Sequence, residues 1–332
     1  MKKILNNARQ LCSGGEGQNY WFNGCMDYLM ECLGESREYN YWFFSGVTGD
    51  SFTQIYCKNL NFPTLCLTDQ LLSDVISKAF SACGYAYEWI TDICTNNRQD
   101  YFKRIQNNIN RGIPVIVKTK MTGCFDNYGV ICGYDEDHFY YLFGEDETPR
   151  IYPERFYELI FVGNKKTCLT LPQVYRNTVM DIPNMITKQE TEDFSFGKQA
   201  FHDWASSLQS GMLNQISDDD PVWYTHDGTF SCWNMHGNYL CMLGTNGCAE
   251  GFLQRALELN EDMKFIEQLL PLYRKHNGEG FAALIDMENG FSLYPRIIKN
   301  KRRMKPISDK ILETGKILDD VLDVFGQSQN IS

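Results

Sequence analysis

The stretch YWFNGCMDYLMECLGE, residues 20–35, determines how the first half of the chain is interpreted. Gly24 leads into Cys25, and an apolar pattern with helical spacing follows it. The stretch therefore predicts a short helix over residues 25–33, with a cysteine in its first turn.

Cys25 has two interpretations. At a helix N-terminus, the unpaired N–H groups and the helix dipole stabilise a thiolate, which is the nucleophilic form of cysteine. Gly24 would let the backbone turn sharply and leave the sulfur accessible, and the side-chain amide of Gln18 is a candidate donor to an oxyanion. However, the chain has 13 cysteines, and a cysteine on an amphipathic helix more often packs in the core, so spacing alone favours packing.

Composition indicates a globular protein with a full core and an acidic surface. The chain has 332 residues, 43% of them hydrophobic, and a net charge of −11. A surface of this sign does not neutralise phosphates, so no nucleic-acid partner is expected. The first ten residues lack the apolar core of a signal peptide, and no apolar run approaches the ~20 residues that span a bilayer. We therefore expect a cytoplasmic protein without a membrane partner and without a disulfide framework.

The first half has the pattern of an α+β domain. Residues 68–83 and 97–112 have helical periodicity, and each segment ends at a glycine. Strands are predicted by β-branched and aromatic runs at 85–90, 113–119, 128–134, 138–144 and 158–163. A short turn between two of these strands indicates an antiparallel sheet.

The second half has a different pattern. A polar segment containing Pro172 and Pro183 is predicted to connect two units. Helical patterns then cover residues 195–211, 250–276 with a break near Asn260, and 308–326. These patterns predict an α+β domain over residues 1–165, a connecting segment over 166–194, and a mostly α-helical domain over 195–332.

Four segments resemble a known family. The stretches NGCMDYLMECLG, YWFFSGVTGDSF, GIPVIVKTK and NYGVICGYDED are similar to the N-terminal domain of the butirosin biosynthesis protein H family. The resemblance covers about residues 12–163 and, more loosely, 195–326. It implies a papain-like domain with a helical C-terminal region, working in a bacterial secondary-metabolite or peptide pathway. In this family a cysteine takes an acyl group from a carrier-protein thioester and passes it to an amine.

The resemblance assigns roles to individual residues. Cys25 matches the nucleophile, Gln18 an oxyanion donor, and Asp146, with Glu145 beside it, the acid that orients the base. The place of the family's general-base histidine falls on Asn127. An amide cannot accept and return a proton, and loss of such a base removes roughly 10²–10⁴ in rate.

Two histidines could replace that base. His226 and His236 lie in the run of polar, aromatic and sulfur side chains over residues 223–248, from which either could reach the site of Cys25. The others, His138, His202 and His276, are expected to be structural. We expect His138 to face solvent, and His276 to lie beside a helix end that suits a cation.

No metal or cofactor is predicted. Cys232, His236, Cys241 and Cys248 share one segment, but their spacing lacks the close cysteine pairs of zinc sites.

Three functions remain open. The first is a cysteine acyltransferase or hydrolase that acts on a thioester or amide, with a small molecule or an acyl carrier as substrate. The second is a catalytically degenerate papain-like binding module, which holds an acyl or peptidyl ligand between the two domains against Trp21, Trp42, Phe43 and Trp223. The third is a scaffold for a carrier protein, against which the acidic charge weighs. The helical domain would be a lid, a homodimer surface or a partner platform.

Overall fold

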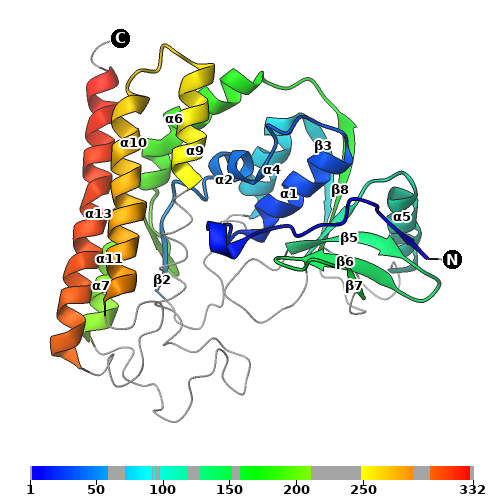
Figure 1. Ribbon diagram of the computed structural model, residues 1–332, viewed down its shortest axis with the longest axis horizontal. Helices are drawn as coiled ribbons and strands as arrows, with labels where there is room; N and C mark the ends of the chain where they lie inside the picture. Colours follow the sequence, from blue (N-terminus) through cyan, green and yellow to red (C-terminus); the bar gives the residue numbers. More distant parts are fainter. Residues whose placement is uncertain are drawn as a thin grey trace. The chain divides into compact units, whose positions relative to one another are not determined.

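The computed structural model describes residues 2–58, 72–91, 93, 98–118, 128–151, 158–210, 248–287 and 300–329 (Figure 1). The chain divides into two compact units. Unit 1 comprises the described residues of Met1–Thr48, Leu71–Met121 and Phe125–Leu169, and unit 2 those of Gly49–Gln70 and Thr170–Ser332. The fold is mixed helix and sheet.

Unit 1 is built on an antiparallel sheet that has seven strands in the described part of the chain. The strands are β1 (Lys3–Ile4), β3 (Tyr85–Ile90), β4 (Val115–Lys118), β5 (Tyr128–Tyr134), β6 (Phe139–Phe143), β7 (Arg150–Ile151) and β8 (Glu158–Lys165). Their order is β3-β8-β4-β5-β6-β7, and β1 pairs with β5. The five strands predicted from the sequence are confirmed, and so is the antiparallel arrangement.

The registers at one side of the sheet bring aromatic residues close to charged ones. Phe143 on β6 pairs with Gly129 on β5, and Tyr141 on β6 pairs with Arg150 on β7. Alternate residues of a strand share a face. Tyr141 and Phe143 therefore lie on one face of β6, next to the β7 arginine.

Helices pack on both faces of this sheet. The helices of unit 1 are α1 (Trp21–Cys32), α2 (Tyr41–Thr48), which packs on α1 and α4, α4 (Leu72–Cys83) and α5 (Arg98–Asn110), with a short 3₁₀ turn, η1 (Gly14–Glu16). Phe80 of α4 stacks on Tyr87 with 4.7 Å between ring centroids, whereas Arg104 of α5 pairs with Glu88. Tyr87 and Glu88 are consecutive on β3 and point to opposite faces, so α4 and α5 pack on opposite faces of the sheet.

Helix α1 begins at Trp21, four residues earlier than the predicted start at Cys25. The prediction was wrong because Gly24 was interpreted as the residue before the helix, whereas it lies within it. Phe22, Cys25, Met26 and Leu29 are all buried at helical spacing, so the apolar pattern already includes the first turn.

Unit 2 is mostly helical. It contains a two-stranded antiparallel sheet of β2 (Ile55–Cys57) and β9 (Phe194–Phe196). Its helices are α6 (Leu171–Ile186), α7 (Gly197–Ser210), α9 (Cys248–Leu259), α10 (Ile266–Arg274), the π-helix η3 (Lys275–Gly280), α11 (Phe281–Asp286) and α13 (Lys301–Gln329). The predicted break near Asn260 is confirmed, because α9 ends at Leu259.

The segment predicted to connect two domains is mainly a helix. Helix α6 occupies Leu171–Ile186 and contains both prolines. Pro172 lies in the first turn, where a missing N–H leaves no hydrogen bond unmade, and the Thr170 backbone N–H donates to Oε1 of Gln173 over 2.9 Å. A proline near a helix start therefore gave the appearance of a linker.

Among the described helices, none combines the length and the apolar character needed to cross a membrane.

Candidate functional site

Cys25, the predicted nucleophile, lies in the interior of unit 1. It is the fifth residue of α1 and has an exposed fraction of 0%. Only the first few residues of a helix carry N–H groups without an intrahelical partner, so Cys25 is not at the helix terminus. A reactive cysteine needs an accessible, electropositive setting, and the structure does not give Cys25 such access.

Gly24 has a packing role in place of the predicted exposing role. A Cβ atom at this position would lie 2.5 Å from the sulfur of Cys12 and would also overlap the Leu11 carbonyl oxygen. In the N-terminal segment, residues 11–14, Leu11 and Cys12 therefore lie directly against α1 at Gly24. The absence of a side chain there allows the segment to cover the helix one residue before Cys25.

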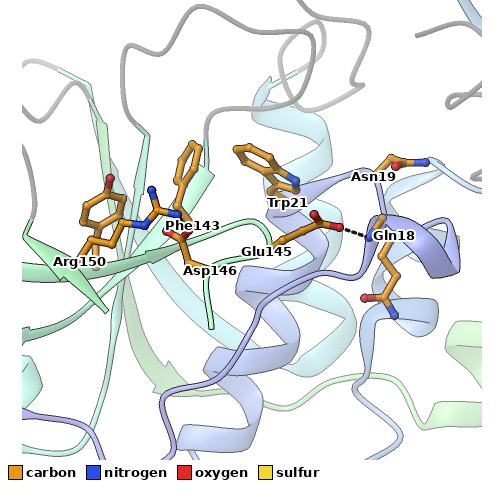
Figure 2. A pocket seen from close by; sticks show the side chains of 9 residues that line it. Gln18, Asn19, Trp21, Phe143, Glu145, Asp146 and Arg150 are labelled. Atoms are coloured by element: carbon orange, nitrogen blue, oxygen red, sulfur yellow. Dashed lines mark hydrogen bonds and ion pairs between the residues drawn. The ribbon is translucent and has the colours of Figure 1, made fainter. Parts of the chain in front are cut away.

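The N-terminal segment is bound to the end of β6. The backbone N–H groups of Leu11 and Cys12 both donate to the carbonyl oxygen of Gly144 over 3.1 Å. The Gly14 N–H donates to Oε1 of Glu145 over 2.6 Å, as drawn in Figure 2. Segments far apart in the sequence are thereby joined next to the start of α1.

Gly144 is constrained by conformation and by packing. Its φ is +53°, in the left-handed region that favours glycine. A Cβ atom there would lie 2.7 Å from Cε2 of Trp21. The backbone at Gly144 thus lies directly against the indole ring at the first position of α1.

A pocket opens beside this contact, entirely within unit 1. Its volume is about 330 Å³, which is at the small end for ligand sites. The residues that line it are Gly14, Gln18, Asn19, Trp21, Tyr141, Phe143, Glu145, Asp146 and Arg150 (Figure 2). Cys25 is not among them.

Aromatic rings form much of the pocket wall. Trp21 and Phe143 meet edge to face, with 4.3 Å between ring centroids and an angle of 78° between the ring planes. Tyr141 lies next to Phe143, at 6.1 Å between centroids. Trp21 and Tyr141 are half-buried, whereas Phe143 is buried, so two of the three rings remain accessible from the pocket.

Charged groups complete the wall. Asp146 forms an ion pair with Arg150, and its backbone N–H donates to the Phe143 carbonyl oxygen over 3.0 Å. Burial raises the pKa of Asp146, although Arg150 opposes this effect. Burial also raises the pKa of Tyr141, and the nearby Asp146 carboxylate adds to that rise.

The structure brings together two of the predicted catalytic residues, Gln18 and Asp146, in this pocket and leaves Cys25 out of it. The Gln18 side-chain oxygen accepts the Ser13 N–H over 2.8 Å. This bond fixes the amide, so that its NH₂ group is the part available as a donor. Asn127, His226 and His236 lie outside the described residues.

Of the remaining histidines, His138 is exposed, as predicted, and His202 is exposed within helix α7. His276, by contrast, is buried in the π-helix with 1% exposure, and burial lowers its pKa. The expectation of a cation beside a helix end is wrong here, because burial favours the neutral imidazole.

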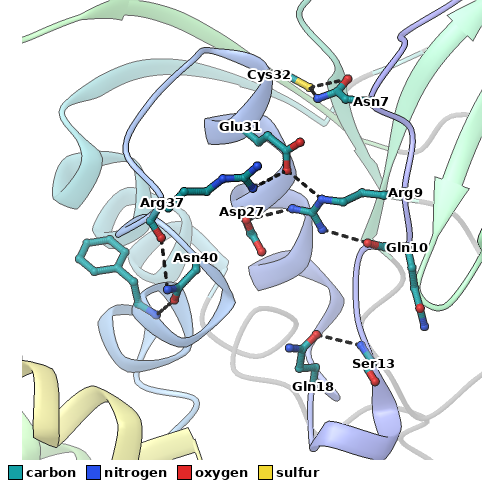
Figure 3. A network of polar contacts seen from close by, with 11 residues as sticks. Asn7, Arg9, Gln10, Ser13, Gln18, Asp27, Glu31, Cys32, Arg37 and Asn40 are labelled. Carbon is teal, nitrogen blue, oxygen red and sulfur yellow. Dashed lines mark hydrogen bonds and ion pairs between the residues drawn. The ribbon is translucent and has the colours of Figure 1, made fainter.

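A second polar cluster lies on the other part of α1. Arg9 donates to Asp27 over 3.0 Å and to Glu31 over 2.9 Å, and Arg37 also pairs with Glu31 (Figure 3). Burial raises the pKa of Asp27 despite the charge of Arg9. These contacts fix the N-terminal chain on α1, and we interpret them as structural.

Sequence reasoning identified only part of the pocket. Trp21 was expected to line a ligand cleft between the two domains, and the structure places it in a pocket within unit 1. Trp42 and Phe43 belong to α2 and do not line this pocket, and Trp223 lies outside the described residues. Tyr141, Phe143 and Arg150 were not predicted. Their spacing contains a signal: two aromatics two residues apart on a strand share a face, and a glycine follows them.

The described residues contain no group of three or more His, Cys, Asp or Glu that could hold a metal ion. Cys232, His236 and Cys241 are not described.

A scan of the sequence against protein-family models gives no match, and a search among curated proteins gives none either.

Proposed function

We propose that this chain is a ligand-binding protein whose papain-like N-terminal domain has lost cysteine catalysis. In this proposal, the pocket at the start of α1 holds a small ligand or a single side chain of a peptide. The proposal rests on the different environments of Trp21 and Cys25, which lie on the same helix. Trp21 lines the pocket at the helix start, whereas Cys25 is fully buried one turn further on.

The chemistry of the wall supports binding over catalysis. Among the described residues that line the pocket there is no serine, threonine, cysteine or histidine. Nucleophilic catalysis needs an activated hydroxyl, thiol or amine next to a base. Asp146, which the family resemblance would assign to orienting a histidine, forms an ion pair with Arg150 instead.

The pocket has the composition of a binding site. Ligand sites combine aromatic walls with a few polar groups that fix orientation. Here Trp21, Tyr141 and Phe143 supply the aromatic surface, and Gln18 and Glu145 are held in place by hydrogen bonds to the N-terminal segment. Rigid polar groups beside accessible rings reduce the entropy lost on binding.

The proposal is tested by screening a library of small fragments for binding by ligand-observed NMR, using the full-length protein. We expect fragments that bind wild type and bind Cys25→Ala equally well. The same fragments should lose at least about tenfold in affinity with Trp21→Leu, because the ring contributes the main wall.

A matched control is Trp42→Leu, which removes a half-buried tryptophan outside the pocket. Amide NMR spectra establish that each variant is folded. The proposal fails if no fragment binds wild type, or if the affinity of the bound fragments is unchanged in Trp21→Leu.

A further inference from the structure

The pocket wall is suited to a positive charge. The faces of aromatic rings carry a negative quadrupole and attract cations, most strongly at tryptophan. Trp21 and Tyr141 are half-buried rings that line the pocket, and they come from α1 and β6. Two separate elements thus present aromatic surface to the same small volume.

The charged residues of the pocket also favour a cation. The described lining residues include two carboxylates, Glu145 and Asp146, and one guanidinium, that of Arg150, so this part of the wall has one net negative charge. Asp146 and Arg150 neutralise each other in an ion pair, which leaves Glu145 as the unbalanced charge. An anionic ligand would meet both carboxylates and is disfavoured.

Glu145 is fixed in position and retains a carboxylate oxygen for a ligand. Its Oε1 accepts the Gly14 N–H over 2.6 Å, and no described residue forms a hydrogen bond or ion pair with Oε2. Figure 2 shows the carboxylate between the Trp21 ring and the N-terminal segment. A charge next to an indole in a small pocket is a recognition element for a cation.

The hydrogen-bond capacity of the wall distinguishes between kinds of cation. A primary ammonium is strongly hydrated and has three N–H donors that need acceptors. In this pocket the Gln18 oxygen accepts the Ser13 N–H and Asp146 is paired with Arg150, which leaves Oε2 of Glu145 as one acceptor for three donors among these carboxylate and amide side chains. Aromatic faces do not replace the lost water of a primary ammonium, but they suit a cation that has no N–H groups.

On the basis of the proposed function, we propose that the ligand of this pocket carries a quaternary ammonium group, which lies against Trp21 and Tyr141 with Glu145 as its counter-ion. The group can come from a free solute, such as choline, or from a trimethylated lysine side chain of a peptide. The chemistry of recognition is the same for both sources.

The test compares ligands of matched shape by isothermal titration calorimetry on the full chain. Choline is compared with 3,3-dimethylbutan-1-ol, which has the same shape without the charge, and with ethanolamine, which has the charge with N–H donors. We expect choline to bind about 5- to 30-fold more tightly than either. Equal affinities for choline and its neutral isostere would overturn the inference.

The charge is tested with Glu145→Gln, which keeps an oxygen for the Gly14 N–H. We expect a loss of about 3- to 10-fold in choline affinity and a weaker dependence of that affinity on salt. The matched control, Glu147→Gln, changes an exposed carboxylate that does not line the pocket and should leave choline affinity unchanged. Equal losses in the two variants would contradict the assigned counter-ion.

A third comparison identifies the source of the group. A short peptide with trimethyl-lysine that binds more tightly than choline, and more tightly than its unmethylated form, assigns the site to a peptide. Choline binding as tightly as the peptide assigns it to a solute.

If fragments bind at Trp21 but no quaternary ammonium is preferred, the inference fails while the proposed function stands. If nothing binds, both fail.

Discussion

Trp21 and Cys25 lie one turn apart on helix α1, but their environments are opposite. Trp21 is half-buried and lines a pocket, whereas Cys25 has no exposed surface. At Gly24, which lies between them on the helix, Leu11 and Cys12 of the N-terminal segment lie directly against α1. The position of a cysteine on a helix therefore does not determine its role, because its burial also depends on residues that lie far away in the sequence.

The largest expected effect tests the burial of Cys25. Cys25→Asn places an amide in a site without exposure, so we expect a loss of about 2–4 kcal/mol in the free energy of unfolding. Trp21→Gln should cost about 1 kcal/mol, because the ring is partly exposed. Urea denaturation measures both values.

Cys168→Asn is the control, since the same chemical change is made there at an exposed thiol; we expect a change within about 0.5 kcal/mol. A Cys25→Asn variant as stable as this control would show that Cys25 is accessible to water, contrary to the structure.

The next effect concerns the crossing at Gly24. Gly24→Ala places a methyl group against Leu11 and Cys12, and we expect a net loss of about 1–3 kcal/mol in unfolding free energy from overpacking. Gly251 lies on helix α9, and a Cβ atom added there would have no neighbour within 4 Å. Gly251→Ala should therefore raise the unfolding free energy by up to about 1 kcal/mol through helix propensity. Thermal and urea unfolding of the pair should show opposite signs, and a gain for both would mean that the segment does not pack on α1.

The sequence predicted the sheet well and the pocket poorly. The strands over 85–90 and 128–134 match β3 and β5 residue for residue, because β-branched and aromatic runs are local signals. The start of α1 was missed because a glycine in a helix normally weakens it, and only the crossing segment explains Gly24. The burial of Cys25 likewise depends on contacts that no local pattern contains.

The pocket shows the same limit. Gln18 and Asp146 were placed together on the basis of a family resemblance, and they do line one pocket. The ion pair of Asp146 with Arg150 depends on the register of β6 with β7. Pairing register between strands is set by packing and turn geometry, so the charge balance of the pocket could not be predicted from residue order.

A smaller effect tests the pocket by titration of Asp146, which lines it. The pKa of Asp146 in the folded protein is raised above the ordinary value of 3.8, so the folded state holds this proton more tightly than the unfolded chain does. Protonation of Asp146 therefore stabilises the folded protein. This stabilisation grows as the pH falls from neutral, past the pKa of Asp146 in the folded protein, to about its ordinary pKa. We expect wild type to gain unfolding free energy relative to Asp146→Asn as the pH falls from 7 to 4.

Urea unfolding of both proteins at the two pH values measures this difference. Other groups, including Asp27, titrate equally in wild type and variant, so the comparison isolates Asp146. A relative loss of wild-type stability on acidification would mean that the Arg150 ion pair outweighs burial.

The start of α1 is accessible from the pocket at Trp21, whereas Cys25 is buried. The most direct test of this difference is to alkylate the native protein with iodoacetamide across pH and map the modified cysteines by mass spectrometry. We predict that Cys168, which is exposed, reacts before Cys25, and that Cys25 reacts only when the protein is unfolded by urea. Rapid modification of Cys25 in the native protein, with a thiolate already present below neutral pH, would contradict the account and restore Cys25 as a nucleophile.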